Sequence, residues 1–207
     1  MIASPVSDGK RGAHLPKRAA CSILDSSPPR RKEQRLAGPI PVISVVGRSD
    51  SGKTTLLEQL IPELKRRGYS VAVIKHSYRG GVEFDVPGKD SYRLAQAGAD
   101  QVLLGTRDKV VHIRRCEQEP TLNELVADIR DVDLILVEGH KAANVPKIEV
   151  NRREIGTELI TQEEDLIAIV SDQRFNLSVP QFEPADTVGL ADLVERFVRA
   201  ARSLDSP

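Results

Sequence analysis

Apolar runs and helical apolar patterns alternate along this chain. Short runs rich in Val, Ile and Leu, each bounded by polar residues, are typical of buried strands. They occur at residues 41–46, 71–74, 101–104, 109–113, 134–137, 147–150 and 166–170. Apolar residues at helical spacing predict helices over residues 56–64, 91–97, 121–129 and 190–200. This order of elements predicts an α/β fold in which helices flank a mostly parallel central sheet.

The start of the chain has a different composition. Pro, Ser, Lys and Arg dominate residues 1–38. This composition predicts a disordered basic tail, which is either dispensable or a docking arm for an acidic partner. The remaining residues, 39–207, are enough for one folded domain with a single core.

Charge and cysteine content narrow the function classes. Lys and Arg balance Asp and Glu at 30 each, so the net charge is zero and nothing favours nucleic-acid or membrane binding. Cys21 and Cys116 form no CxxC or Cys/His cluster, which argues against a disulfide framework and a structural zinc site. No apolar stretch reaches the length of a membrane span or a signal core, so we expect a cytoplasmic protein.

Residues 47–55 carry a phosphate-binding motif, because their sequence GRSDSGKTT fits the pattern G-x-x-x-x-G-K-[ST]. The motif stands between a predicted strand and a predicted helix, as a P-loop does. Lys53 is expected to reach the β- and γ-phosphates of a nucleotide, and the hydroxyl of Thr54 to bind Mg²⁺. The chain is therefore predicted to be a P-loop NTPase that binds nucleotide through Gly47, Arg48, Ser49, Asp50, Ser51, Gly52, Lys53, Thr54 and Thr55.

Further candidates follow from the rule that ligands lie at the carboxyl ends of parallel strands. Glu138 and Gly139 come directly after the strand at 134–137. We expect Glu138 to act on Mg²⁺ through water or to orient the attacking water, with the Gly139 amide near the γ-phosphate. A carboxylate after a strand can also be a helix cap or part of a solvated turn. Asp133 precedes the same strand and is expected at the far end of the sheet.

A polar segment after the second strand supplies two more carboxylates. Lys75 ends that strand on the same rim as Glu138 and is expected to contact the nucleotide. The Pro-Gly turn that follows, with Asp85 and Asp90, suits a mobile loop that folds over phosphate and Mg²⁺. Asp85 is the candidate for metal binding and catalysis beside Glu138. Asp90 fits a catalytic role and an N-cap of the helix at 91–97 equally well.

Five segments of the chain form a more specific pattern than the P-loop alone. They are the P-loop itself, VIKH at residues 73–76, FDVPGKDS at 84–91, LVEGHK at 136–141 and PKIEV at 146–150. In sequence, order and spacing they resemble the molybdopterin-guanine dinucleotide biosynthesis adapter family, MobB. The resemblance covers residues 41–172, and the PGKDS and VEG sequences are its most specific parts.

This resemblance implies a homodimeric P-loop protein that binds GTP and Mg²⁺ and hydrolyses GTP weakly. It implies an adapter that assists the guanylyltransferase attaching GMP to the molybdenum cofactor, with molybdopterin as a further candidate ligand. Lys53 and Thr54 then contact phosphate and Mg²⁺, while Asp85 and Glu138 bind Mg²⁺ or position water. Residues 77–83 replace the histidine-rich stretch common in the family, so no role of those histidines is carried over.

Base selectivity and the reaction class stay open at this point. The Asn-Lys-x-Asp element that holds guanine in many GTPases is absent, and Asp172, after the last apolar strand, is the candidate acceptor from guanine N1 and N2. The alternative function is an ATP-dependent small-molecule kinase with Glu138 as its base. In that case Lys75, Asp85 or Arg93 would orient the acceptor hydroxyl.

Two further features bear on these alternatives. A kinase usually carries a lid arginine, and Arg152 and Arg153 are the only obvious candidates, although their short polar connection resembles a surface turn more closely. For the dimer, the strand at 109–113 is the candidate interface, because a hairpin at a sheet edge can pair with a second chain.

Overall fold

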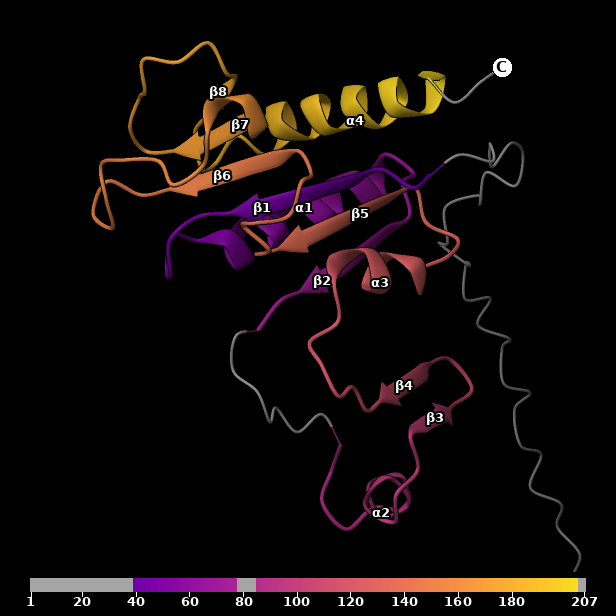
Figure 1. Ribbon diagram of the computed structural model, residues 1–207. Coiled ribbons are helices and arrows are strands. Elements are labelled where there is room, and N and C mark those ends of the chain that lie inside the picture. The colour runs from indigo at the N-terminus through magenta and orange to yellow at the C-terminus, as the bar shows by residue number, and fades with distance from the viewer. Residues whose placement is uncertain (1–38, 78–84, 205–207) are drawn as a thin grey trace, which may run out of the picture. The chain divides into compact units, whose positions relative to one another are not determined.

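The computed structural model describes residues 39–77 and 85–204, and a six-stranded sheet is its main element (Figure 1). The strand order is β2-β5-β1-β6-β7-β8, and every neighbouring pair is parallel. The prediction of a parallel central sheet is confirmed. The strands are β1 (Val42–Val46), β2 (Val71–Lys75), β5 (Leu134–Glu138), β6 (Lys147–Asn151), β7 (Leu166–Ser171) and β8 (Gln181–Phe182).

Helices cover both faces of this sheet, as predicted. The helices of the described chain are α1 (Lys53–Arg66), α2 (Asp90–Gln96), α3 (Leu122–Ala127) and α4 (Thr187–Leu204), with a short 3₁₀ helix, η1 (Glu163–Asp165). In Figure 1, α1 and α4 lie on one face of the sheet and α3 on the other. The basic tail at residues 1–38 and residues 78–84 of the expected mobile loop lie outside the described part of the chain. Those two features and the domain boundary at residue 39 therefore stay predictions.

Strand β5 shows why the central strands are apolar at every position. Leu134 and Leu136 pack in a cluster with residues of α1 and α4, whereas Ile135 and Val137 pack in a second cluster with residues of α3. Alternate residues of a strand point to opposite faces of its sheet. A strand covered on both faces therefore needs a continuous apolar run, and all four side chains are buried.

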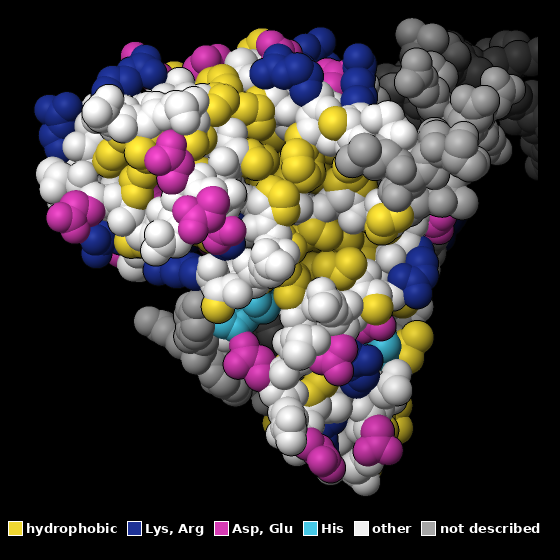
Figure 2. Space-filling view, turned by 45° about the horizontal axis from the view of Figure 1, so that its top comes forward, with side chains coloured by type: hydrophobic (Ala, Val, Ile, Leu, Met, Phe, Trp, Pro, Cys, Tyr) yellow, Lys and Arg dark blue, Asp and Glu magenta, His cyan; other side chains and the backbone are white. Residues whose placement is uncertain are grey.

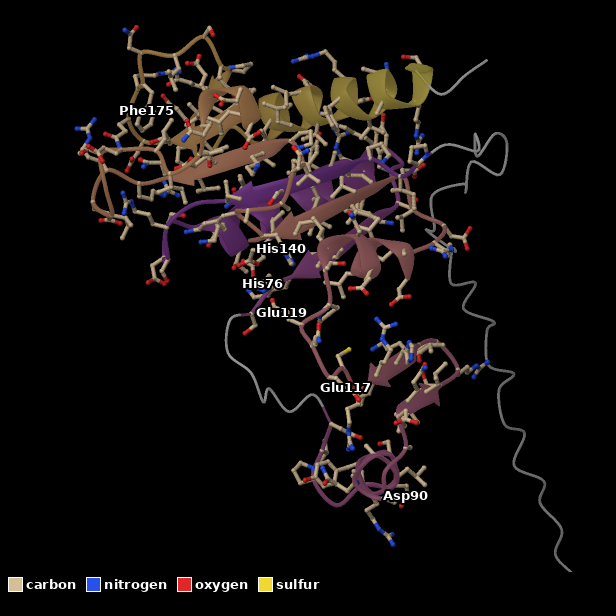
Figure 3. All side chains as sticks on the ribbon, viewed as in Figure 1. His76, Asp90, Glu117, Glu119, His140 and Phe175 are labelled. Atoms are coloured by element: carbon tan, nitrogen blue, oxygen red, sulfur yellow. The ribbon has the colours of Figure 1, made fainter. Side chains whose placement is uncertain are left out.

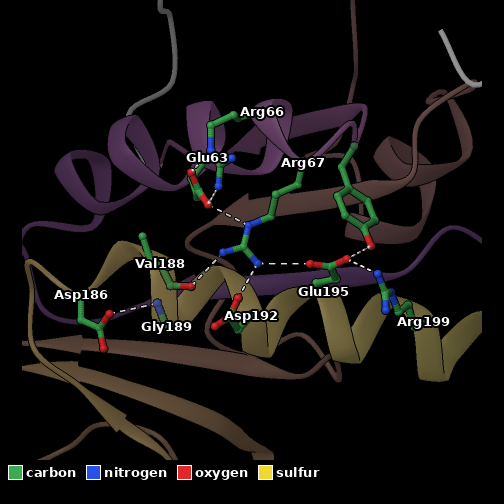
Figure 4. A network of polar contacts seen from close by, with 10 residues as sticks. Glu63, Arg66, Arg67, Asp186, Val188, Gly189, Asp192, Glu195 and Arg199 are labelled. Carbon is green, nitrogen blue, oxygen red and sulfur yellow. Dashed lines mark hydrogen bonds and ion pairs between the residues drawn. The ribbon is translucent and has the colours of Figure 1, made fainter. Parts of the chain in front are cut away.

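Polar contacts join α1 to α4 at their exposed edge (Figure 4). The guanidinium of Arg67, just past the end of α1, lies 2.8 Å from the Glu63 carboxylate, 2.6 Å from Asp192 and 3.1 Å from Glu195. Hydrogen bonds from Arg66 and Arg67 lower the pKa of Glu63 to about 2. This network fixes the helix that follows the P-loop against the last helix of the chain.

Helix starts agree with the sequence at one helix and differ at another. Helix α3 follows Thr121, the first residue of the predicted helix, with a capping box: the Thr121 side chain accepts from the Glu124 amide and the Glu124 carboxylate accepts from the Thr121 amide. For α2 the N-cap is Lys89, so of the two roles left open for Asp90 the N-cap is the one that the structure excludes. Asp90 is instead the first helical residue, where its charge favours the helix dipole without a capping bond.

The hairpin that the sequence suggested at a sheet edge is not an edge of the central sheet. β3 (Gln101–Gly105) and β4 (Val110–Arg114) pair antiparallel in a separate two-stranded sheet. Leu103 is 64% exposed and Val110 71%, so these strands lack the cover that the central strands have. The sequence also did not predict β8, because two residues are too few to form a recognisable apolar run.

Candidate nucleotide-binding site

The loop between β1 and α1 has a backbone that only its own glycines allow. Gly47 has a φ of +146°, and a Cβ placed there would lie 2.2 Å from the Val150 carbonyl oxygen and 2.7 Å from the Ser51 Oγ. Gly52, with a φ of +95°, and Asp50, with a φ of +61°, also lie in the left-handed region. Gly tolerates that region freely and Asp better than most residues do. The structure thus builds a compact turn at the carboxyl end of β1.

Helix α1 begins at Lys53 and points its first turn at this loop. Its N-cap, Gly52, provides no side-chain cap, and the first turn contains no acidic residue. The free N–H groups and the positive end of the helix dipole therefore face the loop uncompensated. The Lys53 Nζ donates to the Arg48 carbonyl oxygen at 2.7 Å, so the side chain folds back across the loop. An anion in this turn would meet several donors at once.

Burial is the main cause that lowers the pKa of Lys53 from its usual value. The Glu138 carboxylate acts in the opposite direction, while the positive charges of Lys141 and Lys75 lower the pKa further. Three lysines thus share one end of the sheet. Because their mutual repulsion is relieved by a bound anion, this electrostatic environment favours a phosphate ligand.

Glu138, Lys75 and Thr54 meet at the carboxyl ends of adjacent strands, as the sequence predicted. Glu138 ends β5 and is the ladder partner of Lys75, which ends β2. The Lys75 Nζ lies 2.9 and 3.0 Å from the two carboxylate oxygens of Glu138, and the Thr54 hydroxyl donates to Oε1 of Glu138 at 2.8 Å. The Glu138 side chain is only 12% exposed, whereas Lys75 is 60% exposed. The ion pair holds the carboxylate beside the first turn of α1.

Two oxygen donors placed in this way fit Mg²⁺. Thr54 and Glu138 supply a hydroxyl and a carboxylate, which are hard ligands of the kind that Mg²⁺ prefers. The Ser51 hydroxyl is a further polar group, buried and without a hydrogen-bond partner among the described residues. In those residues no group of three or more His, Cys, Asp or Glu side chains is placed to hold a metal. Mg²⁺ bound by one or two protein groups together with phosphate needs no such cage.

Gly139 lies at this site but its amide is already engaged. With a φ of +104°, Gly139 donates its N–H to the Val45 carbonyl oxygen at 3.0 Å and accepts from the Ser44 hydroxyl. In this structure the Gly139 amide is therefore already used by β1, and its expected position near the γ-phosphate stays a prediction. Both bonds tie the connection after β5 to β1, so Gly139 fixes the position of Glu138 next to the P-loop.

Within the described residues, Asp85 and Asp172 form no hydrogen bond with Thr54 or Glu138. Asp85 accepts from the Val86 amide at 2.8 Å through one oxygen. Its other oxygen is buried and has no hydrogen-bond partner among the described residues. Asp172 follows β7 at the same end of the sheet, where its Oδ1 accepts from the Arg153 amide at 2.9 Å.

Sequence reasoning missed a contact between the connections that follow β2 and β5. The rings of His76 and His140 lie 4.3 Å apart, and the Glu119 carboxylate contacts Nε2 of His76 (Figure 3). Burial is the main cause that lowers the pKa of His140, and the charge of His76 adds to it, while Glu119 opposes both. The only sequence signal was a histidine after each of two adjacent strands, which parallel pairing brings together.

The parallel sheet, the glycine-dependent turn and the adjacent Lys53, Thr54 and Glu138 define a P-loop nucleotide-binding protein. Residues 42–172 match the family model of the molybdopterin guanine dinucleotide synthesis protein B, MobB. The chain belongs to the MobB family, so the family suggested by the sequence is confirmed.

Similar proteins agree with this assignment. The chain is 35% identical over 161 residues to the molybdopterin-guanine dinucleotide biosynthesis adapter protein of Haemophilus influenzae, covering 77% of this chain and 90% of that protein. It is 37% identical over 166 residues to the Escherichia coli protein of the same name, with coverages of 77% and 94%. The crystal structure of Bacillus subtilis MobB superposes with a TM-score of 0.60 and 27% identity, covering 76% of this chain and 97% of that chain. The kinase alternative is not favoured by these comparisons.

One face of the molecule carries charges of both signs. On the face drawn in Figure 2, acidic and basic side chains are interspersed and do not gather by sign. Within residues 39–77 and 85–204, no helix combines the length and the apolar character that crossing a bilayer requires.

Proposed function

We propose that this chain is a GTP-binding adapter that assists the transfer of GMP to molybdopterin by a guanylyltransferase. One observation carries the proposal: the Thr54 hydroxyl and the Glu138 carboxylate lie 2.8 Å apart beside Lys53, in a chain whose residues 42–172 match the MobB family. The relatives from H. influenzae and E. coli carry the adapter name.

Different groups of the P-loop contact different parts of the bound nucleotide in this proposal. Backbone N–H groups of residues 47–55 surround the phosphates, and Lys53 leaves its bond to the Arg48 carbonyl oxygen to reach the β- and γ-phosphates. Thr54 and Glu138 hold Mg²⁺, directly or through water, and Thr55 supports the α-phosphate. Mg²⁺, when bound there, would offset the negative charge of the phosphates.

Hydrolysis of GTP is slow in this account. Glu138 accepts a hydrogen bond from Thr54 and can orient an attacking water, yet both of its oxygens are held by Lys75. Asp85 is a second candidate for Mg²⁺ or water, and one of its oxygens is buried without a hydrogen-bond partner among residues 39–77 and 85–204, which is consistent with a ligand contact. A protein that keeps GTP bound for long periods suits an adapter better than an enzyme of high turnover.

Asp172 stays the candidate for recognition of guanine. Its Oδ2 is not used in the bond that Oδ1 accepts from the Arg153 amide, and this oxygen can accept from guanine N1 and N2. Adenine offers no such pair of donors. Asp172→Ala should therefore lower the ratio of GTP to ATP affinity, and an unchanged ratio would remove Asp172 from the site.

A homodimer, cytoplasmic location and contact with molybdopterin are further parts of the proposal. Strand β4 has one edge that β3 does not cover, and Val111 on it is 43% exposed. A cysteine introduced at Val111 should crosslink two copies of the chain. A purely monomeric product would exclude pairing through β4.

The adapter role is tested by formation of molybdopterin guanine dinucleotide. The guanylyltransferase is supplied with molybdopterin and GTP, alone or with this chain, and product formation is followed. Native chain should raise the yield or rate, Lys53→Ala should not, and Lys65→Ala in the last turn of α1 should act like native chain. Equal stimulation by all three variants would show that the P-loop is not involved in the adapter role.

A further inference from the structure

Arg152 lies against the P-loop although a hundred residues separate them in sequence. Strand β6, which pairs directly with β1, ends at Asn151, so the next residue emerges beside the loop that follows β1. The Arg152 guanidinium nitrogens lie 3.5 and 3.7 Å from the position of a Cβ at Gly52. Gly52 is the residue before Lys53, where the first amides of α1 face the loop. Arg152 is therefore placed where phosphate oxygens would lie.

The guanidinium of Arg152 has no partner in the described part of the chain. Its side chain is half-buried and makes no hydrogen bond or ion pair there. Arg67, in contrast, contacts three carboxylates. A guanidinium has five N–H donors, and partial burial without an acceptor is unfavourable. A phosphate group is the acceptor that such a planar donor fits best.

The turn that carries Arg152 is held in place by bonds that do not use its side chain. The amides of Ile155 and Gly156 donate to the Arg152 carbonyl oxygen at 2.9 and 3.0 Å. Asn151 and Gln173 donate side-chain N–H groups to the Gly156 carbonyl oxygen at 3.1 and 3.0 Å. The backbone is thus fixed before any ligand binds, which reduces the entropy cost of a contact from Arg152.

The P-loop and the turn after β6 also pack against each other through their side chains. The Arg48 side chain, from the P-loop, lies over Gly156, with its Nε 2.9 Å from the position of a Cβ there. Arg152, from the turn after β6, in return lies over Gly52 of the P-loop. Each arginine therefore packs on a glycine of the other loop. This arrangement directs the Arg152 guanidinium to the N-terminal end of α1.

We propose that Arg152 binds the phosphate groups of the nucleotide in the P-loop and supplies a second cation beside Lys53. This inference rests on the proposed nucleotide site but names a residue outside its motif. Arg153, the other lid candidate from the sequence, is exposed and contributes its backbone amide to Asp172. The structure thus separates two adjacent arginines into one that faces the P-loop and one that does not.

The test is calorimetric titration of the full chain with Mg-GTP in four variants. Arg152→Ala should weaken binding at least about tenfold, because a charge-assisted contact is lost. The affinity of Arg152→Lys should lie between those of Arg152→Ala and native chain, since lysine keeps the charge but lacks the planar set of N–H donors of a guanidinium. Arg153→Ala should bind as native chain does, and Lys53→Ala should lose binding. The melting temperature without nucleotide should be nearly equal in the two Arg152 variants and native chain.

Three results would overturn the inference. Native affinity in Arg152→Ala, with binding lost in Lys53→Ala, would reject Arg152 as a ligand and leave the proposed function intact. Equal weakening by Arg152→Ala and Arg153→Ala would show a general effect of charge only. Failure of native chain to bind Mg-GTP would reject the nucleotide site and this inference together.

Discussion

At position 47 the structure has room for no side chain larger than the hydrogen atom of glycine. Its Cα approaches the end of β6 so closely that a methyl group would meet the Val150 carbonyl oxygen at 2.2 Å. The backbone of one strand or the other would have to move to avoid this overlap. The pattern G-x-x-x-x-G-K-[ST] therefore begins with Gly here for a steric reason and a conformational reason at once.

Gly47→Ala and Gly68→Ala separate those two reasons. Gly68, after α1, has a φ of +90° with no atom within 4 Å of a Cβ, so its substitution should cost only about 1 kcal/mol for the left-handed backbone. Gly47→Ala adds the clash with Val150 and should lower the melting temperature further and remove GTP binding. Thermal unfolding and titration measure both effects. Equal melting temperatures in the two variants would contradict the steric argument.

Glu138 is the residue on which the proposed Mg²⁺ contact depends. Glu138→Gln keeps the shape of the side chain but removes its charge, so GTP affinity in the presence of Mg²⁺ should fall about tenfold or more. Affinity measured with a chelator should change little. Glu164→Gln, an exposed residue of η1, is the matched control. If Mg²⁺ improves GTP binding equally in Glu138→Gln and native chain, Glu138 does not act on the metal.

At the scale of elements, the positions of α1 and β5 determine what the P-loop can bind. Helix α1 is fixed by its buried leucines and by the Arg67 network at its C-terminal end. Strand β5 lies between β1 and β2, which places Glu138 between Lys53 and Lys75. The site is therefore a property of neighbouring strands and not of the loop alone.

The α1–α4 network should make stability depend on acidity. Hydrogen bonds from Arg66 and Arg67 lower the pKa of Glu63 in the folded chain from 4.5 to about 2. Its contribution to the free energy of unfolding is complete above the unfolded pKa and is lost as pH falls from about 4.5 toward 2. Glu63→Gln should therefore lose less stability over this range than native chain. Glu58→Gln, an exposed residue of α1, should behave as native chain does, and denaturant unfolding at each pH measures the difference.

Local parts of the site could be predicted from the sequence. The P-loop lies within nine consecutive residues, and the apolar runs at 134–137 and 71–74 mark strands whose ends carry Glu138 and Lys75. Because the carboxyl ends of parallel strands lie at the same edge of a sheet, these two side chains could be placed on one rim. Their direct ion pair was not predictable, because it requires β2 and β5 to be neighbours in the sheet.

Other parts depend on the order of strands, which the sequence does not contain. Arg152 was considered only as a lid candidate, and its position on Gly52 follows from the pairing of β6 with β1. The Gly139 amide, which the sequence places near the γ-phosphate, donates to the carbonyl oxygen of Val45, a residue of β1. Each of these contacts joins residues about a hundred positions apart. Pattern and spacing along the chain carry no information on such pairs.

At the scale of the whole molecule, the fold brings one set of cations to one end of a parallel sheet while the net charge of the chain is zero. The charges of Lys75 and Lys141 both act on Lys53 there and lower its pKa. Arg152 adds a fourth positive group beside the same loop. A protein of balanced overall charge thus keeps a locally positive site, which fits a small anion such as a nucleotide better than a nucleic acid.

The most direct test of this account is calorimetric titration with Mg-GTP and with Mg-ATP, for native chain, Lys53→Ala and Lys65→Ala. Native chain and Lys65→Ala should bind Mg-GTP more tightly than Mg-ATP. Lys53→Ala should lose this binding, while its melting temperature without nucleotide stays near that of native chain. A preference for ATP would contradict the proposed GTP-binding adapter. No binding by the native chain would contradict the nucleotide site itself.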